Sequence, residues 1–223
     1  MMTVKGVLLD FNGTLFFDSK FHELAWKAIS KELRGYEMSE EELRDHMHGK
    51  NNDKVIEYIM GKAIDDDENK RYSLKKEAMY RTMCMNHPQD FHLANGVEYF
   101  FDYLISHQIP FTIASASIKE NIDFFVEKFH LDHWIDPSFI VYDNGQYPTK
   151  MEMFLEAARR IQVDIKDCLI VEDSVSGIAF AHACGVKNII AMASAHDKTK
   201  FEQFPFIKKI LNDFSEFPFD ILG

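Results

Sequence analysis

The stretch VKGVLLDFNGTL, residues 4–15, decides the fold class of this chain. Residues 4–9 are mainly apolar, and the run ends at Asp10, shortly before the turn-forming pair Asn12-Gly13. A short apolar run that stops at an Asn-Gly turn predicts a strand buried on both faces. Such strands are typical of a parallel sheet that helices cover on each side. Asp10 is then expected at the carboxyl end of a strand, where α/β sheets bind their ligands.

Four further stretches carry a strand pattern: residues 110–114, 139–142, 168–171 and 186–192. Apolar residues at helical spacing separate them, as at Val97, Phe100, Phe101 and Leu104. The alternation of strands and helices from about residue 95 onward predicts the α/β class, with a Rossmann-like, doubly wound parallel-sheet core.

Residues 18–90 show a different pattern. Helical stretches are expected near 20–34, 40–47, 52–62 and 68–85, with no strand between them. The acidic run at residues 65–68 is expected to cap the last of these helices. We therefore expect an all-helical cap domain, residues 18–90, inserted into a core formed by residues 1–17 and 91–223.

Composition and charge exclude several classes of partner. The net charge of -11 argues against nucleic acid and against anionic membranes, because both need a positive face. No apolar run reaches the ~18 residues that a membrane span requires. The three scattered cysteines form no CxxC pair, which favours reduced thiols over a disulfide framework or a zinc site. Asp10 interrupts the apolar N-terminal run and no cationic leader is seen, so we expect a cytoplasmic protein, and a monomer.

Three motifs at predicted strand ends carry chemistry. Asp10 offers a carboxylate nucleophile beside turn amides that can hold an anion. The hydroxyl of Ser115, in the ASAS stretch at residues 114–117, suits a phosphate oxygen. Glu172 and Asp173 offer the hard oxygen ligands that Mg²⁺ prefers. Taken singly, each motif has a structural alternative: a turn-capping aspartate, an N-cap serine or a solvated acidic turn.

With these motifs in this order, the chain resembles the haloacid dehalogenase-like superfamily, and within it the β-phosphoglucomutase-like phosphatases and phosphomutases. The stretch HELAW at residues 22–26 resembles the start of that group's cap, and IASAS at residues 113–117 its second motif. Glu172-Asp173-Ser174 with Gly177 is similar to its fourth motif. The resemblance covers nearly the whole chain.

The resemblance implies a role for each matching residue. Asp10 would form an aspartyl-phosphate and ligate Mg²⁺, together with the backbone carbonyl of Asn12 and the carboxylate of Asp173. Glu172 would be a direct or second-layer partner of the metal, and Ser115 would hold the transferring phosphoryl group. The substrate would be a small phosphorylated metabolite, and the residues expected to contact it are Thr14, His22, Lys50, Asn52 and Ala116.

Asn12 departs from the family pattern, which has an acid/base aspartate at this position. An amide neither donates a proton to a leaving alkoxide nor takes one from water, and general acid–base catalysis is typically worth ~10²–10⁴-fold. Three explanations stay open. The substrates have good leaving groups, as acyl phosphates do; or a cap residue such as His22 supplies the proton; or catalysis has been lost, by evolution or by an engineered change, leaving a phosphometabolite-binding protein.

Two further positions depart from the pattern. Lys150 lies nearer to a helix start than the family lysine; it either neutralises the phosphoryl group as a flexible point charge or is a surface lysine. The loop at residues 48–52 lacks the arginine that grips the distal phosphate in mutases, with Asn52 near its place and Lys50 as a partial substitute. We therefore expect a Mg²⁺-dependent phosphatase, with sugar phosphomutase or a silent binding protein as the alternatives.

Overall fold

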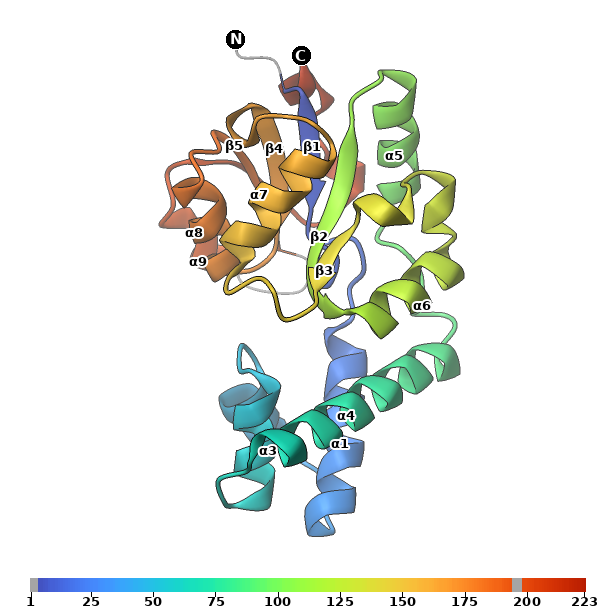
Figure 1. Ribbon diagram of the computed structural model, residues 1–223, viewed down its shortest axis with the longest axis vertical. Coiled ribbons are helices and arrows are strands. Elements are labelled where there is room, and N and C mark those ends of the chain that lie inside the picture. Colours follow the sequence, from blue (N-terminus) through green and yellow to red (C-terminus); the bar gives the residue numbers. More distant parts are fainter. Residues whose placement is uncertain (1–3, 194–197) are drawn as a thin grey trace. The chain divides into compact units, whose positions relative to one another are not determined.

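The computed structural model describes residues 4–193 and 198–223, and the chain divides into two compact units. The core unit comprises Met1–Phe17 and His92–Gly223, and the helical unit comprises Asp18–Phe91 (Figure 1). Each unit is described by itself below.

The described residues of the core unit contain a six-stranded parallel sheet in the order β3-β2-β1-β4-β5-β6. Leu9 on β1 is in register with Ile113 on β2 and with Val171 on β4, so the ends of these three strands lie together. All residues of β1 and β4 are buried, as expected of strands covered on both faces. The predicted α/β class is confirmed. The strands are β1 Gly6–Leu9, β2 Phe111–Ile118, β3 Val141–Asp143, β4 Cys168–Glu172, β5 Asn188–Met192 and β6 Ile207–Leu211.

Helices cover both faces of this sheet. Figure 1 shows α5 (Val97–Ser106) and α6 (Lys119–Phe129) on one side, and α7 (Lys150–Arg160) and α8 (Val175–Ala183) on the other. The ring of Phe11, just after β1, stacks on Phe125 of α6 with centroids 4.4 Å apart. Leu8 belongs to a second apolar cluster that includes Phe154 of α7. The remaining elements of this unit are short: α9 Thr199–Glu202 and the 3₁₀ turns Leu131–His133, Pro137–Phe139, Ile165–Asp167, Phe214–Glu216 and Phe219–Leu222.

The helical unit contains no strand among its residues, all of which the structure describes. Asp65 accepts a hydrogen bond from the Glu68 amide at 2.8 Å, which confirms the predicted acidic cap of the last helix. The unit has its own apolar core, which includes Trp26, Ile29 and Ile56. Its elements are α1 Ser19–Arg34, α2 Glu40–Glu42, the π-helix η1 Leu43–Met47, α3 Asn52–Met60 and α4 Asp66–Asn86.

The structure corrects the sequence prediction in three places. Strand β6 was not predicted, because it lies at the sheet edge and its exposed lysines, Lys208 and Lys209, interrupt the apolar pattern. Strand β2 extends to Ile118, so Ser115 lies within the strand rather than at its predicted end near residue 114. The predicted helix at 40–47 continues from α2 into a π-helix, a wider turn that residue spacing does not signal.

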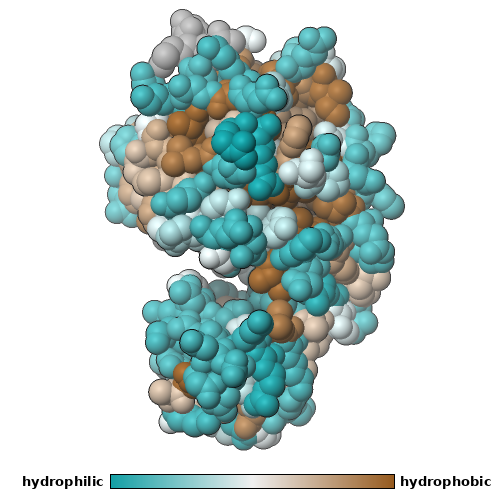
Figure 2. Space-filling view, in the orientation of Figure 1, coloured by the Kyte–Doolittle hydropathy of each residue, from teal (hydrophilic) through white to brown (hydrophobic). Residues whose placement is uncertain are grey.

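No helix within residues 4–193 and 198–223 is long and apolar enough to cross a membrane. Figure 2 shows that the helical unit is mainly hydrophilic on the face that is drawn.

Candidate active site

Asp10 follows β1 directly and is held there by its backbone. Its amide donates to the carbonyl of Val171 on β4 at 3.0 Å, and its side chain is buried. The chain then turns at Gly13, whose φ is +79°. A Cβ at this position would lie 2.2 Å from Asp173 Oδ2, so glycine is required both for the turn and for the close approach of Asp173.

Lys150 is the first residue of α7, and Thr149 and Glu152 form a capping box that fixes this helix start. The Lys150 ammonium pairs with Asp10 Oδ1 and lies 3.4 Å from Glu172 Oε2. Its side chain is only 12% exposed, so Lys150 is not a surface lysine. The candidate nucleophile, Asp10, is thus in contact with a buried cation.

Burial and charge shift the pKa values of this pair. Burial raises the pKa of the Asp10 carboxyl to about 7; Lys150 opposes this shift and Glu172 adds to it. Burial alone would lower the pKa of the Lys150 ammonium. The negative charges of Asp10 and Glu172 have the larger combined effect, so the pKa of Lys150 lies above its ordinary value. Lys150 therefore stays protonated, whereas Asp10 without a further cation holds its negative charge poorly near neutral pH.

The carboxylates of Asp10, Glu172 and Asp173 fit a divalent cation. Each offers an oxygen within 4.8 Å of the others. Glu172 Oε1 accepts from the amide and hydroxyl of Ser174, at 3.0 and 2.7 Å, but Oε2 is buried and makes no hydrogen bond; the Lys150 ammonium, 3.4 Å away, is shared with Asp10. A buried carboxylate oxygen without a hydrogen bond is costly, and a divalent cation would satisfy it. Three hard oxygen donors are what Mg²⁺ accepts, with waters completing its octahedron.

Gly177 on α8 makes room for Glu172. A Cβ on Gly177 would lie 2.3 Å from the carboxyl carbon of Glu172, well inside van der Waals contact. The glycine in the quoted fourth motif is thus required by packing against the candidate metal ligand.

Ser115, Ser117 and Asn12 form a hydrogen-bonded group. The Asn12 side-chain oxygen accepts from the Ser117 hydroxyl at 2.6 Å and from the Ser115 hydroxyl at 3.3 Å. The Ser117 amide donates to Ser115 Oγ at 3.2 Å. Ser117 belongs to the ASAS stretch but was not predicted from the sequence to have a role.

Other residues of the core unit differ in exposure. Ala116 is exposed, as a substrate contact requires, whereas Thr14 is fully buried and its hydroxyl has no hydrogen-bond partner among the described residues. Lys200 on α9 donates to the backbone carbonyl of Asp173 at 3.2 Å. No motif marks Lys200, so only the fold could reveal this second lysine beside the acidic residues.

The predicted residues of the helical unit have partners within that unit. His22 Nε2 lies 3.1 Å from Asp18 Oδ2, and His22 Nδ1 lies 2.7 Å from Lys76 Nζ. Asn52 donates to Glu77 Oε1 at 3.3 Å, and Lys50 is exposed. We refer to the polar residues joined in this way as the helical-unit cluster: Asp18, His22, Asn52, Lys76, Glu77 and Tyr80.

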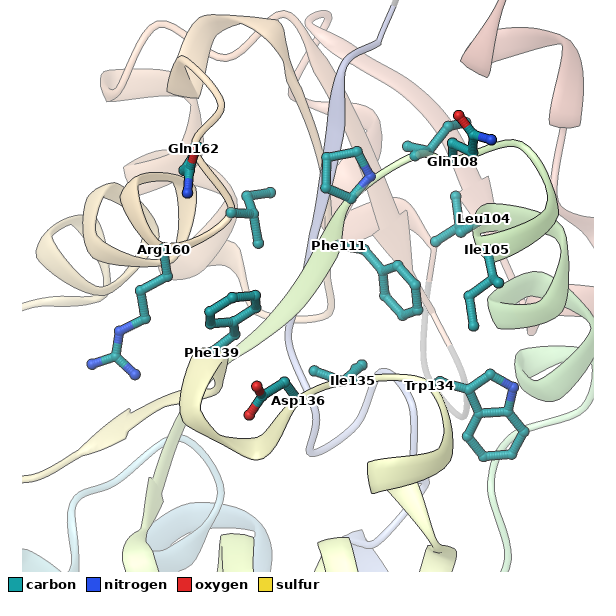
Figure 3. A pocket seen from close by; sticks show the side chains of 13 residues that line it. Leu104, Ile105, Gln108, Phe111, Trp134, Ile135, Asp136, Phe139, Arg160 and Gln162 are labelled. Atoms are coloured by element: carbon teal, nitrogen blue, oxygen red, sulfur yellow. The ribbon is translucent and has the colours of Figure 1, made fainter.

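A separate cavity of about 390 Å³ lies at the other end of β2. Figure 3 shows the rings of Phe111, Trp134 and Phe139 around it. Phe111 is the first residue of β2, whereas Ser115 lies further along toward its carboxyl end. The polar groups of Asp136 and Arg160 are bonded to backbone groups of Ser138 and Ile140. Its lining contains no metal-binding cluster, so this cavity is not the candidate active site.

Comparison with known proteins identifies the family. The model for haloacid dehalogenase-like hydrolases matches residues 7–191, so the chain belongs to this family, and the resemblance inferred from the motifs is confirmed.

Individual relatives and solved structures are also similar to this chain. A crystal structure of a haloacid dehalogenase hydrolase, family IA, variant 3, from Entamoeba histolytica is 34% identical, with a TM-score of 0.92 over 98% of this chain and 97% of that one. β-Phosphoglucomutase from Clostridium difficile shares the fold at 16% identity, with a TM-score of 0.73 over 98% and 95% of the two chains. The bifunctional riboflavin kinase/FMN phosphatase of Arabidopsis thaliana is 31% identical over 107 residues, which are 47% of this chain and 27% of that protein.

Proposed function

We propose that this protein is a Mg²⁺-dependent phosphatase that transfers the phosphoryl group of a small phosphorylated metabolite to Asp10 and then to water. The observation that carries the proposal is the buried Lys150–Asp10 pair, whose single ammonium also lies beside a buried Glu172 oxygen that makes no hydrogen bond. A nucleophile, a cation for phosphoryl oxygens and an unsatisfied metal ligand meet at one end of the sheet. Family membership supports phosphatase-type chemistry.

The metal would be held by Asp10, Asp173 and the backbone carbonyl of Asn12, with Glu172 as a further oxygen donor. When bound, Mg²⁺ would supply positive charge toward the phosphoryl oxygens. Its charge would also favour ionised Asp10, which burial otherwise disfavours.

The chain's own residues account for the transfer steps. An Asp10 carboxylate oxygen attacks phosphorus in line as the bond to the leaving group breaks. The Lys150 ammonium and the Ser115 hydroxyl bind oxygens of the phosphoryl group and hold it in place. Water then attacks phosphorus, and Asp10 leaves as a carboxylate.

The helical unit favours water over a second substrate hydroxyl as the final acceptor. A mutase must hold a distal phosphate strongly, and this chain has Asn52 near the place of the expected arginine. The Asn52 amide is also hydrogen-bonded to Glu77, which leaves Lys50 as the exposed cation of this loop. In the same proposal, Lys50 contributes to substrate choice.

A second candidate function, a phosphometabolite-binding protein with little turnover, follows from one observation. Asn12 provides an amide where the family uses a carboxyl group, and its oxygen is committed to two serine hydroxyls. The second candidate predicts binding of Mg²⁺ and phosphate without release of product.

The experiment that separates the two is phosphate release from a panel of acyl, sugar and nucleotide phosphates with Mg²⁺, using this chain and Asn12→Asp. Turnover of any substrate by the unchanged chain supports the phosphatase. Turnover only by Asn12→Asp supports the binding protein. If neither protein releases phosphate from any substrate, the proposed function is wrong.

A matched control for the added carboxylate is Asn144→Asp. Asn144 is exposed, and its side-chain oxygen accepts from the Gln146 amide, a contact that aspartate retains. This variant is expected to behave as the unchanged chain.

A further inference from the structure

The Asn12 amide is oriented by its hydrogen bonds. Ser117 and Ser115 both donate to its oxygen, so the nitrogen end of the amide points away from these two serines. The side chain is only partly exposed, and two contacts from β2 restrict its rotation. Asn12 is thus a fixed polar group beside Asp10 that neither takes up nor releases a proton.

The described groups near Asp10 that could act as a base already have partners. The Lys150 ammonium pairs with Asp10 and lies 3.4 Å from Glu172 Oε2, and Ser174 donates twice to Glu172 Oε1. Asp173 belongs to the proposed metal-ligand set. Among the described residues of the core unit, we therefore assign no carboxylate or imidazole as the base that accepts a proton from an attacking water.

His22, the alternative proton carrier, is committed within the helical unit. Lys76 donates to its Nδ1, which leaves the proton of a neutral imidazole on Nε2, facing Asp18. The ring also stacks on Tyr80, with centroids 4.2 Å apart. To serve as an acid or base, His22 would have to give up one of these contacts.

The two transfer steps make different demands on proton transfer. When the leaving group is a carboxylate, whose conjugate acid has a pKa of about 4, it departs with the electron pair of the broken P–O bond and needs no proton. The second step adds water to phosphorus, releases Asp10 as a carboxylate and must also remove a proton from that water. Without a general base, this second step loses the ~10²–10⁴-fold that such catalysis typically supplies.

We propose that acyl phosphates are the substrate class of this protein and that its aspartyl-phosphate on Asp10 persists, because Asn12 slows transfer to water but not formation from an acyl phosphate. The inference rests on the proposed function. It makes the phosphorylated chain the main species during turnover.

The test mixes the full-length chain with acetyl phosphate and Mg²⁺, quenches with acid and measures the intact mass. Most of the chain is expected to gain the mass of one phosphoryl group. Acetate release should show a burst of about one equivalent followed by a slow phase. Asn12→Asp should shorten the life of the adduct by about 10²-fold or more, whereas Asn144→Asp should leave it unchanged.

The outcomes separate this inference from the proposed function. Steady phosphate release by the unchanged chain, with no burst and no adduct, would overturn the inference and leave the phosphatase intact. An adduct that survives Asp10→Ala would place the phosphoryl group elsewhere and overturn it as well. If both the unchanged chain and Asn12→Asp form no adduct and release no phosphate, the proposed function itself is overturned.

Discussion

Each unit of this protein buries a cluster of charged side chains, and the two clusters differ in how completely their members are paired. In the core unit, the three carboxylates of Asp10, Glu172 and Asp173 share the Lys150 ammonium, and the buried Oε2 of Glu172, 3.4 Å from that ammonium, makes no hydrogen bond. The helical-unit cluster is continuous. Tyr80 and His22 meet at Asp18, and Lys76 joins His22 to Glu77.

The difference separates a site that needs a ligand from a cluster that stabilises the fold. A buried group with more carboxylates than cations is tolerated when a metal ion supplies the missing positive charge. A buried cluster whose members satisfy one another holds its helices together, here α1 and α4, without any ligand.

The largest effect is expected from Asp10→Ala. It removes the proposed nucleophile, so phosphate release should fall by about 10⁴-fold or more. The control is Asp123→Ala on α6, an exposed aspartate paired with Lys119, which should leave turnover unchanged. Residual turnover of Asp10→Ala above a few per cent would show that another group attacks phosphorus.

Lys76→Met should break the helical-unit cluster. The change leaves the buried Glu77 carboxylate without the Lys76 ammonium and removes the donor to His22 Nδ1, and losing one member of a buried pair typically costs about 3–5 kcal/mol. Urea unfolding measures this loss of stability. The neighbouring Lys75→Met removes an exposed pair with Glu32 and should cost less than about 1 kcal/mol. Equal losses in the two variants would mean that the cluster contributes no more than a surface pair.

Gly177→Ala should damage the core cluster without touching the nucleophile. The added Cβ displaces Glu172, so the affinity for Mg²⁺ should fall by about 10–100-fold. Mg²⁺ titration followed by thermal unfolding reads this out independently of activity. Ser176→Ala, an exposed position on the same helix, is the control. Unchanged Mg²⁺ affinity in Gly177→Ala would remove Glu172 from the metal site.

The smallest effect concerns pH. In the metal-free fold the pKa of Asp10 is raised to about 7 from its ordinary value of 3.8, so the folded state binds a proton more tightly than the unfolded chain. This contribution to stability is present at low pH and is lost as pH rises through that window. Mg²⁺ must displace this proton at about pH 5.5 but not at about pH 8, so it should raise the unfolding temperature more at the higher pH. An equal rise at both pH values would argue against Asp10 as a metal ligand.

The sequence predicted the core cluster well because its members are local to strand ends. Asp10 and Glu172 each end an apolar run, and parallel strands bring such ends together. Lys150 was harder to place, because a helix start beside a sheet is a tertiary feature. Only the structure shows its ammonium on Asp10.

The helical-unit cluster was not predicted, apart from His22 and Asn52, which were expected to bind substrate. Asp18, just before α1, and Lys76, on α4, are far apart in the sequence, and no motif spacing relates them. Lys76 lies in a mainly polar helix, a composition that is typical of a solvent-exposed helix, yet its side chain is only 3% exposed. Such burial depends on how α1 packs against α4, which residue patterns within either helix do not determine.

The pairing partners of strand β1 are far from it in the sequence, and this affects the chain during its synthesis. Val7 pairs with Phe111 on β2 and with Leu169 on β4, whereas Asp18–Phe91 is one continuous segment. At about 5–20 residues per second, a ribosome exposes β1 for on the order of ten seconds before β2 emerges to pair with it. The helical segment can fold during that interval. The apolar strand that precedes Asp10 has no sheet partner until then. Newly made chains should therefore be most prone to aggregate, and to bind chaperones, through residues 6–9.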